Sequence, residues 1–407
     1  MFSIKNLLAI LMMTSLFSIS TMADNRMYSV EIDLKTKELR NKAASIIHLD
    51  QIRNDKGYAV VNKHDLLKLK SVFGKKVLNV KELNFVQNQI GTLDQYQFPK
   101  GDEAFHTYEE VVSALDNYKR DYSNIATVFE FGQTVEGRSI PAIKITGVKK
   151  FHKDQFVPAI LFVGSHHARE HLSTEIPMLL IKYLLESYET NPEVKKLVDS
   201  REIYLVPMLN SDGAMYDIGN RKYKMWRKNR IQNDNRSFGV DLNRNYSFGW
   251  GTGGSSRSPN SDVYMGPKPF SEPETQAVKK FVENNANIRV LLSFHTFSEL
   301  ILYPWGGKNT GIGGEDQRVF EKMAQTMSKW NGYKPMQASG LYVASGDTCD
   351  WAYGEHNIYC FTFELSPKSM WSGGFYPGAK IIDKVFKANI KPSLYLIEKS
   401  ADPKGVL

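Results

Sequence analysis

The chain has 407 residues with 52 Lys or Arg against 44 Asp or Glu, which gives a formal net charge of +8. With 42% apolar and 24% charged residues, its composition is globular and excludes collagen-like, low-complexity and wholly disordered chains. Two cysteines, Cys349 and Cys360, exclude a disulfide-framework protein and a cysteine-built zinc finger. The positive excess is mild for this length, so we expect no nucleic-acid partner.

The first 23 residues have the layout of a secretory signal. Lys5 precedes an apolar stretch from residue 7 to 19, and the small-x-small ending Thr21-Met-Ala23 follows it. The apolar stretch is shorter than the ~20 residues that a membrane-spanning helix needs. We therefore expect residues 1–23 to be removed and the mature protein to be secreted, extracellular or periplasmic, without a membrane anchor. Such a compartment permits a bond between Cys349 and Cys360, but the sequence leaves this pairing open.

Residues 24–97 form a small α+β unit in the prediction. A polar stretch from residue 87 to 101, which contains Pro99 and Gly101, is typical of a linker. A small unit and a linker between an export signal and a larger domain indicate a pro-domain, although an ordinary accessory domain would give the same pattern. The predicted strands are 28–32, 58–61 and 77–80, and the predicted helices are 35–47 and 65–72.

The larger domain, residues 98–407, alternates short apolar runs with helical patterns. Apolar runs of this kind between helices are typical of the buried strands of an α/β sheet. The sequence therefore predicts an α/β fold. The predicted strands are 126–131, 140–145, 158–163, 203–209, 289–294, 300–303 and 358–365, and the predicted helices are 107–122, 172–188 and 378–397.

Two histidines and a glutamate follow predicted strands at their carboxyl ends. His167 and Glu170 come directly after the strand 158–163, and His295 follows the strand 289–294. Binding sites in α/β sheets form beyond the carboxyl ends of the strands. A catalytic zinc ion uses three protein ligands, and imidazole nitrogen and carboxylate oxygen suit it. The sequence therefore predicts a metal site of these three residues.

Two neighbouring histidines are less suitable ligands. His171 lies beyond Glu170 on the starting helix, and His166 points away from His167 if the strand alternation persists. A second His-x-x-Glu string, which begins at His106, is interpreted as a solvated helix start.

The last predicted strand carries a carboxylate. Phe361 and Phe363 fall on one face of this strand, and Thr362 and Glu364 fall on the other. A buried carboxylate without a role is costly, but beside a metal-held water it is a general base. A structural Glu–Arg pair is the alternative. Arginines in two polar strings, around residues 226–230 and 240–245, offer planar forks that match a carboxylate.

Together these residues resemble the zinc metallocarboxypeptidase family of pancreatic carboxypeptidases A and B, and most closely its secreted bacterial branch typified by carboxypeptidase T. The matching strings occur in the family's order and cover nearly all of residues 105–400. They are Glu136-Gly-Arg138, His167-Ala-Arg-Glu170, Asn210-Ser-Asp-Gly213, Trp226-Arg227-Lys228, Gly239-Val-Asp-Leu-Asn243-Arg244-Asn245, His295, Leu302-Tyr-Pro-Trp-Gly306, Asp350-Trp351 and Phe361-Thr-Phe-Glu364-Leu365.

The resemblance implies a mixed, mostly parallel central sheet flanked by helices, behind a small α+β pro-domain that covers the site. It implies one zinc ion on His167, Glu170 and His295, with Glu364 as the base and Arg227 as the oxyanion-stabilising cation. It also implies cis peptide bonds at Thr296–Phe297 and Pro304–Trp305. The substrate-binding residues that it implies are Arg169, Asn243, Arg244, Tyr342, Asp347 and Cys349.

The resemblance implies a secreted enzyme that removes C-terminal residues from peptides and proteins. Asp347 and Cys349 in the pocket loop favour broad specificity for apolar and basic residues, and Phe297 and Lys224 depart from the pancreatic pattern in outer positions. We expect a monomeric precursor that an activating protease cuts between about Gln97 and Phe105. A zinc amidase that trims cell-wall peptides, a non-catalytic binding protein and an anionic-polymer binder are the alternatives. The sequence does not decide calcium binding.

Overall fold

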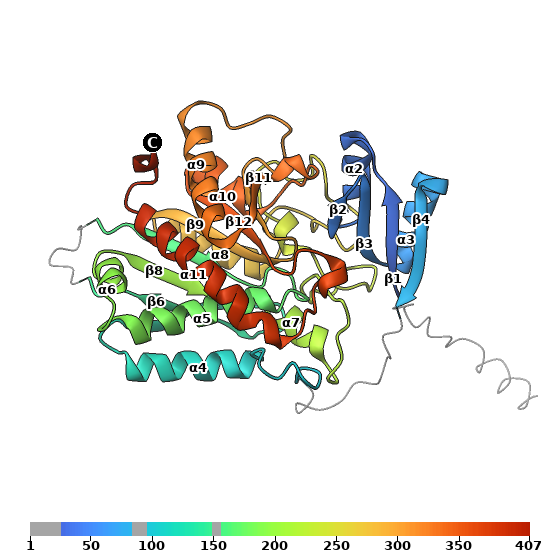
Figure 1. Cartoon of the computed structure of the whole chain (residues 1–407). Helices are drawn as coiled ribbons and strands as arrows, with labels where there is room; N and C mark the ends of the chain where they lie inside the picture. The colour runs from blue at the N-terminus through green and yellow to red at the C-terminus, as the bar shows by residue number, and fades with distance from the viewer. Residues whose placement is uncertain (1–25, 84–95, 149–155) are drawn as a thin grey trace, which may run out of the picture.

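The structure is a computed structural model of the chain that describes residues 26–83, 96–148 and 156–407. The predicted signal peptide and residues 87–95 of the predicted linker lie outside the described residues. The described chain folds into an N-terminal unit, residues 26–83, and a larger domain, residues 96–407, which lie side by side (Figure 1).

An antiparallel four-stranded sheet with the order β2-β3-β1-β4 forms the N-terminal unit. Thr36 and Asn62 cap its two helices with their side chains, a position that both residue types favour. Its apolar side chains form a core of their own. The predicted strands and helices are confirmed, and β2 is an additional short strand. The elements are β1 Met27–Asp33, α2 Lys37–Ala44, β2 Gln51–Arg53, β3 Lys56–Asn62, α3 Lys63–Phe73 and β4 Val77–Leu83.

The larger domain is built on an eight-stranded mixed sheet with the order β11-β10-β12-β9-β7-β8-β6-β5. The four central strands, β12, β9, β7 and β8, run parallel. β10 pairs antiparallel with β12 on one side and parallel with β11, and β6 pairs antiparallel with both β8 and β5 on the other side. The predicted α/β fold with a mixed, mostly parallel central sheet is confirmed. The strands are β5 Ala126–Gln133, β6 Ser139–Ile145, β7 Ala159–Val163, β8 Glu202–Val206, β9 Ile288–Thr296, β10 Leu300–Tyr303, β11 Lys334–Gln337 and β12 Tyr359–Leu365.

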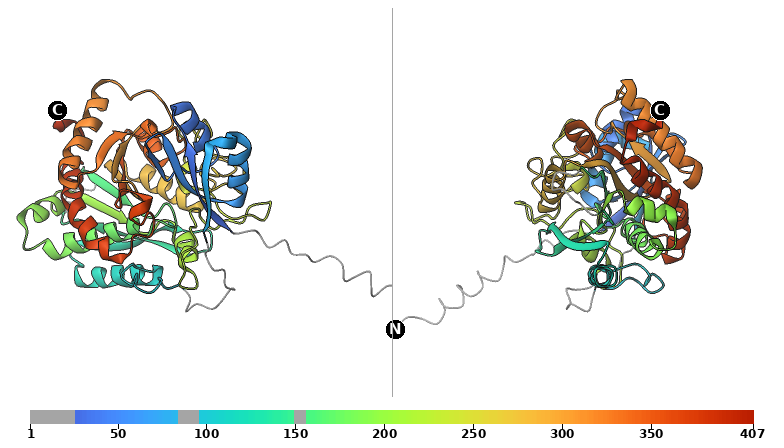
Figure 2. Two further views of the ribbon diagram at one scale, coloured as in Figure 1. Left: turned by 45° about the vertical axis from the view of Figure 1, so that its right-hand side comes forward. Right: turned by 90° about the vertical axis from the view of Figure 1, so that its left-hand side faces the viewer.

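Helices cover both faces of this sheet. Apolar residues of α4, α5, α9 and α11 form the core on one face, where α5 and α11 lie next to each other (Figures 1 and 2). Residues of α8 and α10 form a second core on the other face. The helices are α4 Tyr108–Asp121, α5 Leu172–Ser187, α6 Pro192–Val198, α7 Ser211–Ile218, α8 Pro273–Asn284, α9 Gly314–Asn331, α10 Thr348–His356 and α11 Ile382–Lys399.

Three cis peptide bonds lie in the described chain. Those at Thr296–Phe297 and Pro304–Trp305 confirm the expectation from the resemblance, and Ser366–Pro367 is a third. Within the described ranges, no helix combines the length and the apolar character that a membrane crossing requires.

The N-terminal unit packs on loops of the larger domain. Asn41 Oδ1 accepts a hydrogen bond from Val343 N at 2.8 Å, and Asn62 Nδ2 donates to Asn260 O at 3.0 Å. Tyr342 of the larger domain lies within the apolar core of the N-terminal unit. The contact between the two parts therefore includes apolar packing as well as polar bonds.

Candidate active site and metal centre

Glu364 and His295 project from neighbouring strands at the same level. β12 and β9 run parallel, and their register pairs Glu364 with His295. Directly opposed residues of a sheet share one face, so both side chains lie on the same side. Phe361 and Phe363 lie in the core on the opposite face, which confirms the predicted alternation along this strand.

The side chains of His167, Glu170 and His295 converge beyond the carboxyl ends of β7 and β9. His167 Nδ1 lies 2.8 Å from Glu170 Oε1, and His295 Nδ1 lies 3.0 Å from Glu170 Oε2. The two Nδ1 atoms are 3.1 Å apart, and all three residues are buried. Their possible ligand atoms lie within 4.8 Å of one another, so these residues form a group that could hold one metal ion.

Hydrogen bonds on the outer ring nitrogens indicate which tautomer each imidazole adopts. His167 Nε2 lies 3.1 Å from the carboxylate oxygen Asp241 Oδ1, so Nε2 carries the proton. His295 Nε2 lies 2.9 Å from Ser293 Oγ and can donate in the same way. With the protons on Nε2, both Nδ1 lone pairs face the Glu170 carboxylate, and a cation held between them would satisfy all three groups. Two neutral imidazoles with outer partners and one carboxylate are a donor set that fits zinc.

Arg227 and Asp241 form a buried ion pair beside this group. Arg227 Nε donates to Asp241 Oδ2 at 3.0 Å, and Arg227 Nη1 lies 3.7 Å from Glu170 Oε1. Burial alone would raise the pKa of Asp241, but the Arg227 guanidinium and the His167 ring hold that pKa well below its ordinary value. Asp241 therefore stays ionised and orients both the arginine and the histidine.

Glu364 is half-buried on the same face of the sheet. Burial raises the pKa of Glu364 well above its ordinary value, and the negative charge of Glu170 adds to the rise, while Arg227 and Arg244 oppose it. A carboxyl group with a raised pKa beside a possible metal site is a candidate for general acid–base chemistry.

A short 3-10 turn, Leu242–Arg244, holds two polar side chains in fixed orientations. Arg244 Nε donates to Gly254 O at 2.9 Å, and Arg244 Nη1 donates to Asn243 O at 2.8 Å. Asn243 Oδ1 accepts from both the backbone nitrogen and the hydroxyl of Thr348, each at 2.9 Å. The amide nitrogen of Asn243 and the outer guanidinium nitrogen of Arg244 thus remain the ends that can reach an anion.

The start of α10 brings Asp347 and Cys349 together. Asp347 Oδ1 caps the helix by accepting from Cys349 N and Asp350 N, each at 3.0 Å. Asp347 Oδ2 is buried without a hydrogen-bond partner among the described residues, and burial raises the pKa of this carboxyl. Cys349 forms a disulfide with Cys360, which settles the pairing that the sequence left open. The disulfide connects α10 to β12, so Cys349 has no free thiol.

The N-terminal unit covers two of the predicted substrate-binding residues. Tyr342 Oη lies 3.3 Å from His48 Nδ1, and Arg169 Nη2 donates to Asp50 Oδ1 at 3.1 Å. Both Arg169 and Asp50 are buried, and the Arg169 guanidinium also lies 4.1 Å from the ring centre of Phe375. The carboxylate of Asp50, from the N-terminal unit, is therefore paired with Arg169, the arginine that was predicted to contact substrate.

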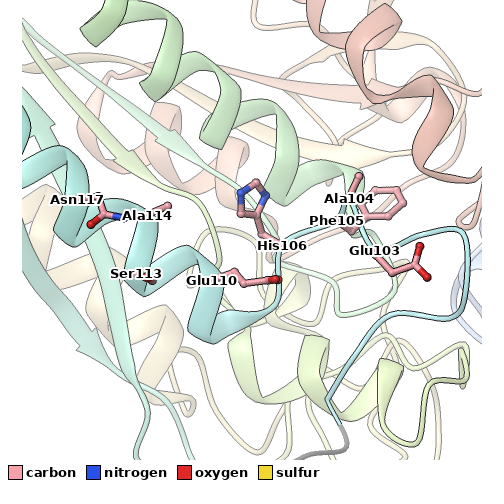
Figure 3. A pocket seen from close by; sticks show the side chains of 8 residues that line it. All are labelled: Glu103, Ala104, Phe105, His106, Glu110, Ser113, Ala114 and Asn117. Atoms are coloured by element: carbon pink, nitrogen blue, oxygen red, sulfur yellow. The ribbon is translucent and has the colours of Figure 1, made fainter.

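A separate hollow of about 300 Å³ lies beside the start of α4 (Figure 3). The His106 ring in its wall pairs with Glu175, with 2.7 Å between Nδ1 and Oε2. The next residue, Thr107, forms a capping box with Glu110, so the second His-x-x-Glu string is the helix start that was predicted. None of the lining residues belongs to the His–Glu–His group. They are Glu103, Ala104, Phe105, His106, Glu110, Ser113, Ala114 and Asn117.

His166 is not among the three possible metal ligands, as expected, but the strand alternation on which that expectation depended does not continue. β7 ends at Val163, and Ser165 has a φ of +57°, so the strand alternation does not continue to the histidines. The rings of both His166 and His167 contact the His295 ring, with ring centres 5.5 and 4.7 Å away. His171 is paired with Asp217, with 2.8 Å between Nε2 and Oδ2, and is not a member of the group.

Sequence reasoning gave no role to three residues that the structure brings to the site. Asp241 lies inside a matched string, and a carboxylate between apolar residues was a signal that could have marked it. Ser293 lies two residues before His295 on the same face of β9, so strand periodicity could have found it. Asp50 lies in the N-terminal unit, and no sequence spacing indicates that it meets Arg169.

Comparison with known proteins supports the reading of the site. The zinc carboxypeptidase (peptidase M14) family profile matches residues 111–391. A zinc carboxypeptidase of Saccharothrix mutabilis subsp. capreolus is 35% identical over 310 residues, which cover 74% of this chain and 70% of that protein. Carboxypeptidase A2 of Rattus norvegicus is 33% identical over 288 residues, which cover 69% of this chain and 66% of the relative.

Solved structures show the same fold over both parts of the chain. Carboxypeptidase A from Helicoverpa armigera matches with a TM-score of 0.73 and 23% identity, covering 93% of this chain and 98% of that one. Thrombin-activatable fibrinolysis inhibitor matches with a TM-score of 0.73 and 22% identity, covering 93% and 99%. The buried His–Glu–His group and the family match agree, and the chain belongs to the zinc carboxypeptidase family, as a zinc metallocarboxypeptidase.

Proposed function

We propose that this enzyme is a secreted carboxypeptidase of broad specificity, made as an inactive precursor. In this proposal residues 1–23 are the signal peptide, residues 24–97 are the pro-domain and linker, and residues 98–407 are the catalytic domain. The register that places Glu364 beside His295, on the face where His167 and Glu170 converge, carries the catalytic part of the proposal. The mature enzyme acts as a monomer, outside the cell or in the periplasm, on the C-termini of peptides and proteins.

We assign His167, Glu170 and His295 as the ligands of one zinc ion. When bound, zinc supplies a Lewis acid and lowers the pKa of a coordinated water to about 7. Glu364 accepts the proton of the attacking water and then delivers it to the nitrogen of the leaving amino acid. Arg227, fixed by Asp241, donates N–H groups to the carbonyl oxygen as negative charge develops there.

Arg244 and Asn243 bind the free carboxylate of the substrate in this proposal. Their backbone and Thr348 contacts hold the guanidinium and the amide in fixed directions before substrate arrives, and such preorganisation lowers the cost of binding. Tyr342 closes over the last residue, and Arg169 contacts the part of the substrate next to it. These contacts explain why only a chain end would fit.

The covered state of these residues supports the precursor hypothesis. Asp50 presents a carboxylate to Arg169, and His48 and Leu49 lie against the hydroxyl of Tyr342. A peptide substrate cannot reach either residue while the N-terminal unit is in this position. An activating protease that cuts between about Gln97 and Phe105 would free the unit.

A peptide library tests the proposed function directly. The full chain, before and after cleavage in the linker, is incubated with peptides that differ only in the C-terminal residue, with and without a zinc chelator. We expect single C-terminal residues to be released by the cut form alone, and the chelator to stop release. Cleavage of internal bonds, or equal rates for the cut and uncut forms, would contradict the proposal.

Asp347→Asn should change specificity without unfolding the start of α10, because asparagine is also a good N-cap residue. The buried and unpartnered Oδ2 atom of Asp347 can pair with the cationic head of a C-terminal Lys or Arg. Loss of this charge should lower kcat/KM for basic residues by about 5- to 30-fold and leave Leu and Phe unchanged. Relative kcat/KM values for matched peptides measure it, and an unchanged basic-to-apolar ratio would refute the role of Asp347.

Docking of the N-terminal unit should weaken as the pH rises. Asp65 Oδ2 accepts a hydrogen bond from Asp262 N at 3.1 Å across the contact. Asp65 Oδ1 and Asp262 Oδ2 are buried without hydrogen-bond partners among the described residues, although Asp262 Oδ2 lies 4.0 Å from Arg169 Nη1. Burial and the Asp262 carboxylate raise the pKa of Asp65 from 3.8 to about 8, although Lys228 and Lys68 oppose the rise. Between pH 3.8 and about pH 8, Asp65 is therefore protonated in the docked form and ionised in the free unit.

The sign follows from proton uptake on docking. Between about pH 7.5 and pH 8, docking becomes less favourable as the pH rises, because His48 and His64 are then neutral in both forms while Asp65 is still protonated mainly in the docked form. The dissociation constant of the cut N-terminal unit should rise by up to about tenfold per pH unit. Asp65→Asn should remove this slope, and the control Asp33→Asn, in a partly exposed pair with Lys35, should keep it. The dissociation constant is obtained from enzyme activity measured over a range of protein concentrations. A slope that survives in Asp65→Asn would contradict the assignment.

A further inference from the structure

His166 is a fully buried histidine to which the proposed mechanism gives no role. Its relative exposure is 1%, and both of its ring nitrogens have partners. His166 Nδ1 lies 3.1 Å from Ser293 Oγ, and His166 Nε2 lies 2.9 Å from Tyr246 Oη and 3.0 Å from Thr348 Oγ1. Burying an apolar side chain at this position would cost less desolvation free energy than burying an imidazole, so the polar contacts of His166 need an explanation.

One side of His166 leads to the predicted zinc ligand His295. Ser293 Oγ lies 2.9 Å from His295 Nε2, and this nitrogen carries the ring proton when Nδ1 is the metal ligand. Ser293 therefore accepts from His295 and must pass its own proton to another acceptor. His166 Nδ1, 3.1 Å away, is that acceptor, so the proton of the His166 ring resides on Nε2.

The other side of His166 leads to the predicted carboxylate anchor Asn243. His166 Nε2–H donates toward the oxygens of Thr348 and Tyr246. Thr348 Oγ1 then donates its proton to Asn243 Oδ1 at 2.9 Å. Because Oδ1 is occupied in this way, the amide nitrogen of Asn243 is turned to the opposite side, where it can donate to an anion.

The hydrogen bonds thus form one chain with a single direction of donation. It runs from His295 through Ser293, His166 and Thr348 to Asn243, and the orientation of each member fixes the next. We propose that His166 is a positioning residue that sets the ring of His295 and the amide of Asn243 together. The inference rests on the proposed roles of those two end residues, and it adds that metal binding and carboxylate binding are coupled.

His166→Leu tests this coupling because leucine fills the space without a donor or an acceptor. We expect the affinity for zinc to fall by about 10- to 100-fold, as is usual when the outer partner of a ligand is lost. We also expect KM for a peptide to rise by about tenfold once the N-terminal unit has been cut off. His166→Gln retains one donor and one acceptor and should recover part of both losses. Zinc affinity is measured on the full chain by competition with a coloured chelator, independently of any activity.

Two partner variants separate the two arms of the chain. Ser293→Ala should chiefly weaken zinc binding and raise KM less than His166→Leu does, whereas Thr348→Val should chiefly raise KM and weaken zinc binding less than His166→Leu does. Adding His166→Leu to Ser293→Ala should cause little further loss of zinc affinity, because both changes break the same connection. His171→Gln, in a buried histidine that pairs with Asp217 instead, is the matched control and should alter neither quantity.

Each outcome decides the proposal. Unchanged zinc affinity and KM in His166→Leu, or additive losses in the Ser293 double variant, would overturn it. A loss of zinc affinity alone would overturn the coupling. If His166→Leu does not fold, the Ser293→Ala and Thr348→Val pair and the His166→Gln variant still provide the test. Failure of the wild-type enzyme to release any C-terminal residue would instead refute the proposed function, since the zinc measurements do not depend on activity.

Discussion

Glu364→Gln should keep the metal and lose turnover by about 10²- to 10⁴-fold, the usual contribution of a general acid–base group. Glutamine has the shape of glutamate but cannot accept the proton of a water molecule. Glu364 lies beside His295 in the strand register, yet the group of three possible ligands is complete without it. The variant should therefore fold, bind zinc with wild-type stoichiometry and fail to cleave peptides.

His295→Ala should give the opposite pattern. Removal of one of the three ligands leaves two groups, His167 and Glu170, that cannot hold the ion firmly, so metal and activity should be lost together. Metal analysis of both dialysed variants, next to kcat values, measures the difference. Glu355→Gln on the surface of α10 is a control that should change neither. Equal zinc loss in the Glu364 and His295 variants would contradict the roles assigned here.

Strand periodicity predicted the half of the site that lies within strands. The alternation along β12 correctly separated Glu364 from Phe363, and the apolar run that precedes His295 correctly placed it at a strand end. The same logic failed for His166, since Ser165 has left-handed backbone and the rule holds only while a strand continues. Strand periodicity therefore predicts the direction of a side chain only for residues within the strand.

The helices show how much local signals contribute. The helix from residue 107 was predicted, and Thr107 and Glu110 form a capping box at its start. α8 and α9 were not predicted, and no side chain caps them, but α6, α7 and α10 were missed although Asn191, Asn210 and Asp347 cap them, so a capping residue alone does not mark a helix. The contacts of Asp50 and Asp65 have no local signal at all, since each depends on how two separately folded parts meet.

Asp50→Ala should release the inhibition that we propose for the N-terminal unit. The Asp50 carboxylate and the Arg169 guanidinium are both fully enclosed between the two parts, and Asp50 also accepts from Val60 N at 2.6 Å. In the variant, docking would bury the arginine with only the Asp262 carboxylate, 4.0 Å away, as a counter-ion. Removal of one partner of a buried pair costs about 3–5 kcal/mol, which corresponds to a docked state weaker by roughly 10²- to 4 × 10³-fold.

The consequence of this loss is measurable in the cut enzyme, where the N-terminal unit can leave. After cleavage in the linker, the wild-type pieces should remain associated and inhibited at concentrations at which the Asp50→Ala pieces separate and cleave peptides at full rate. Asp33→Ala is the matched control. It removes a partly exposed carboxylate of β1 that pairs with Lys35 and not with Arg169, so this variant should behave as wild type.

The pair also explains why inhibition need not involve the metal. Arg169 is held by Asp50, Met225 O and the Phe375 ring, so the N-terminal unit blocks a substrate contact and leaves the His–Glu–His group intact beneath it. Zinc content should therefore be identical in the uncut chain, the cut chain and the Asp50→Ala variant, while activity differs between them. Inhibition that persists unchanged in cut Asp50→Ala would show that other contacts of the unit, such as those of Tyr342 and Asp65, suffice to keep the site closed.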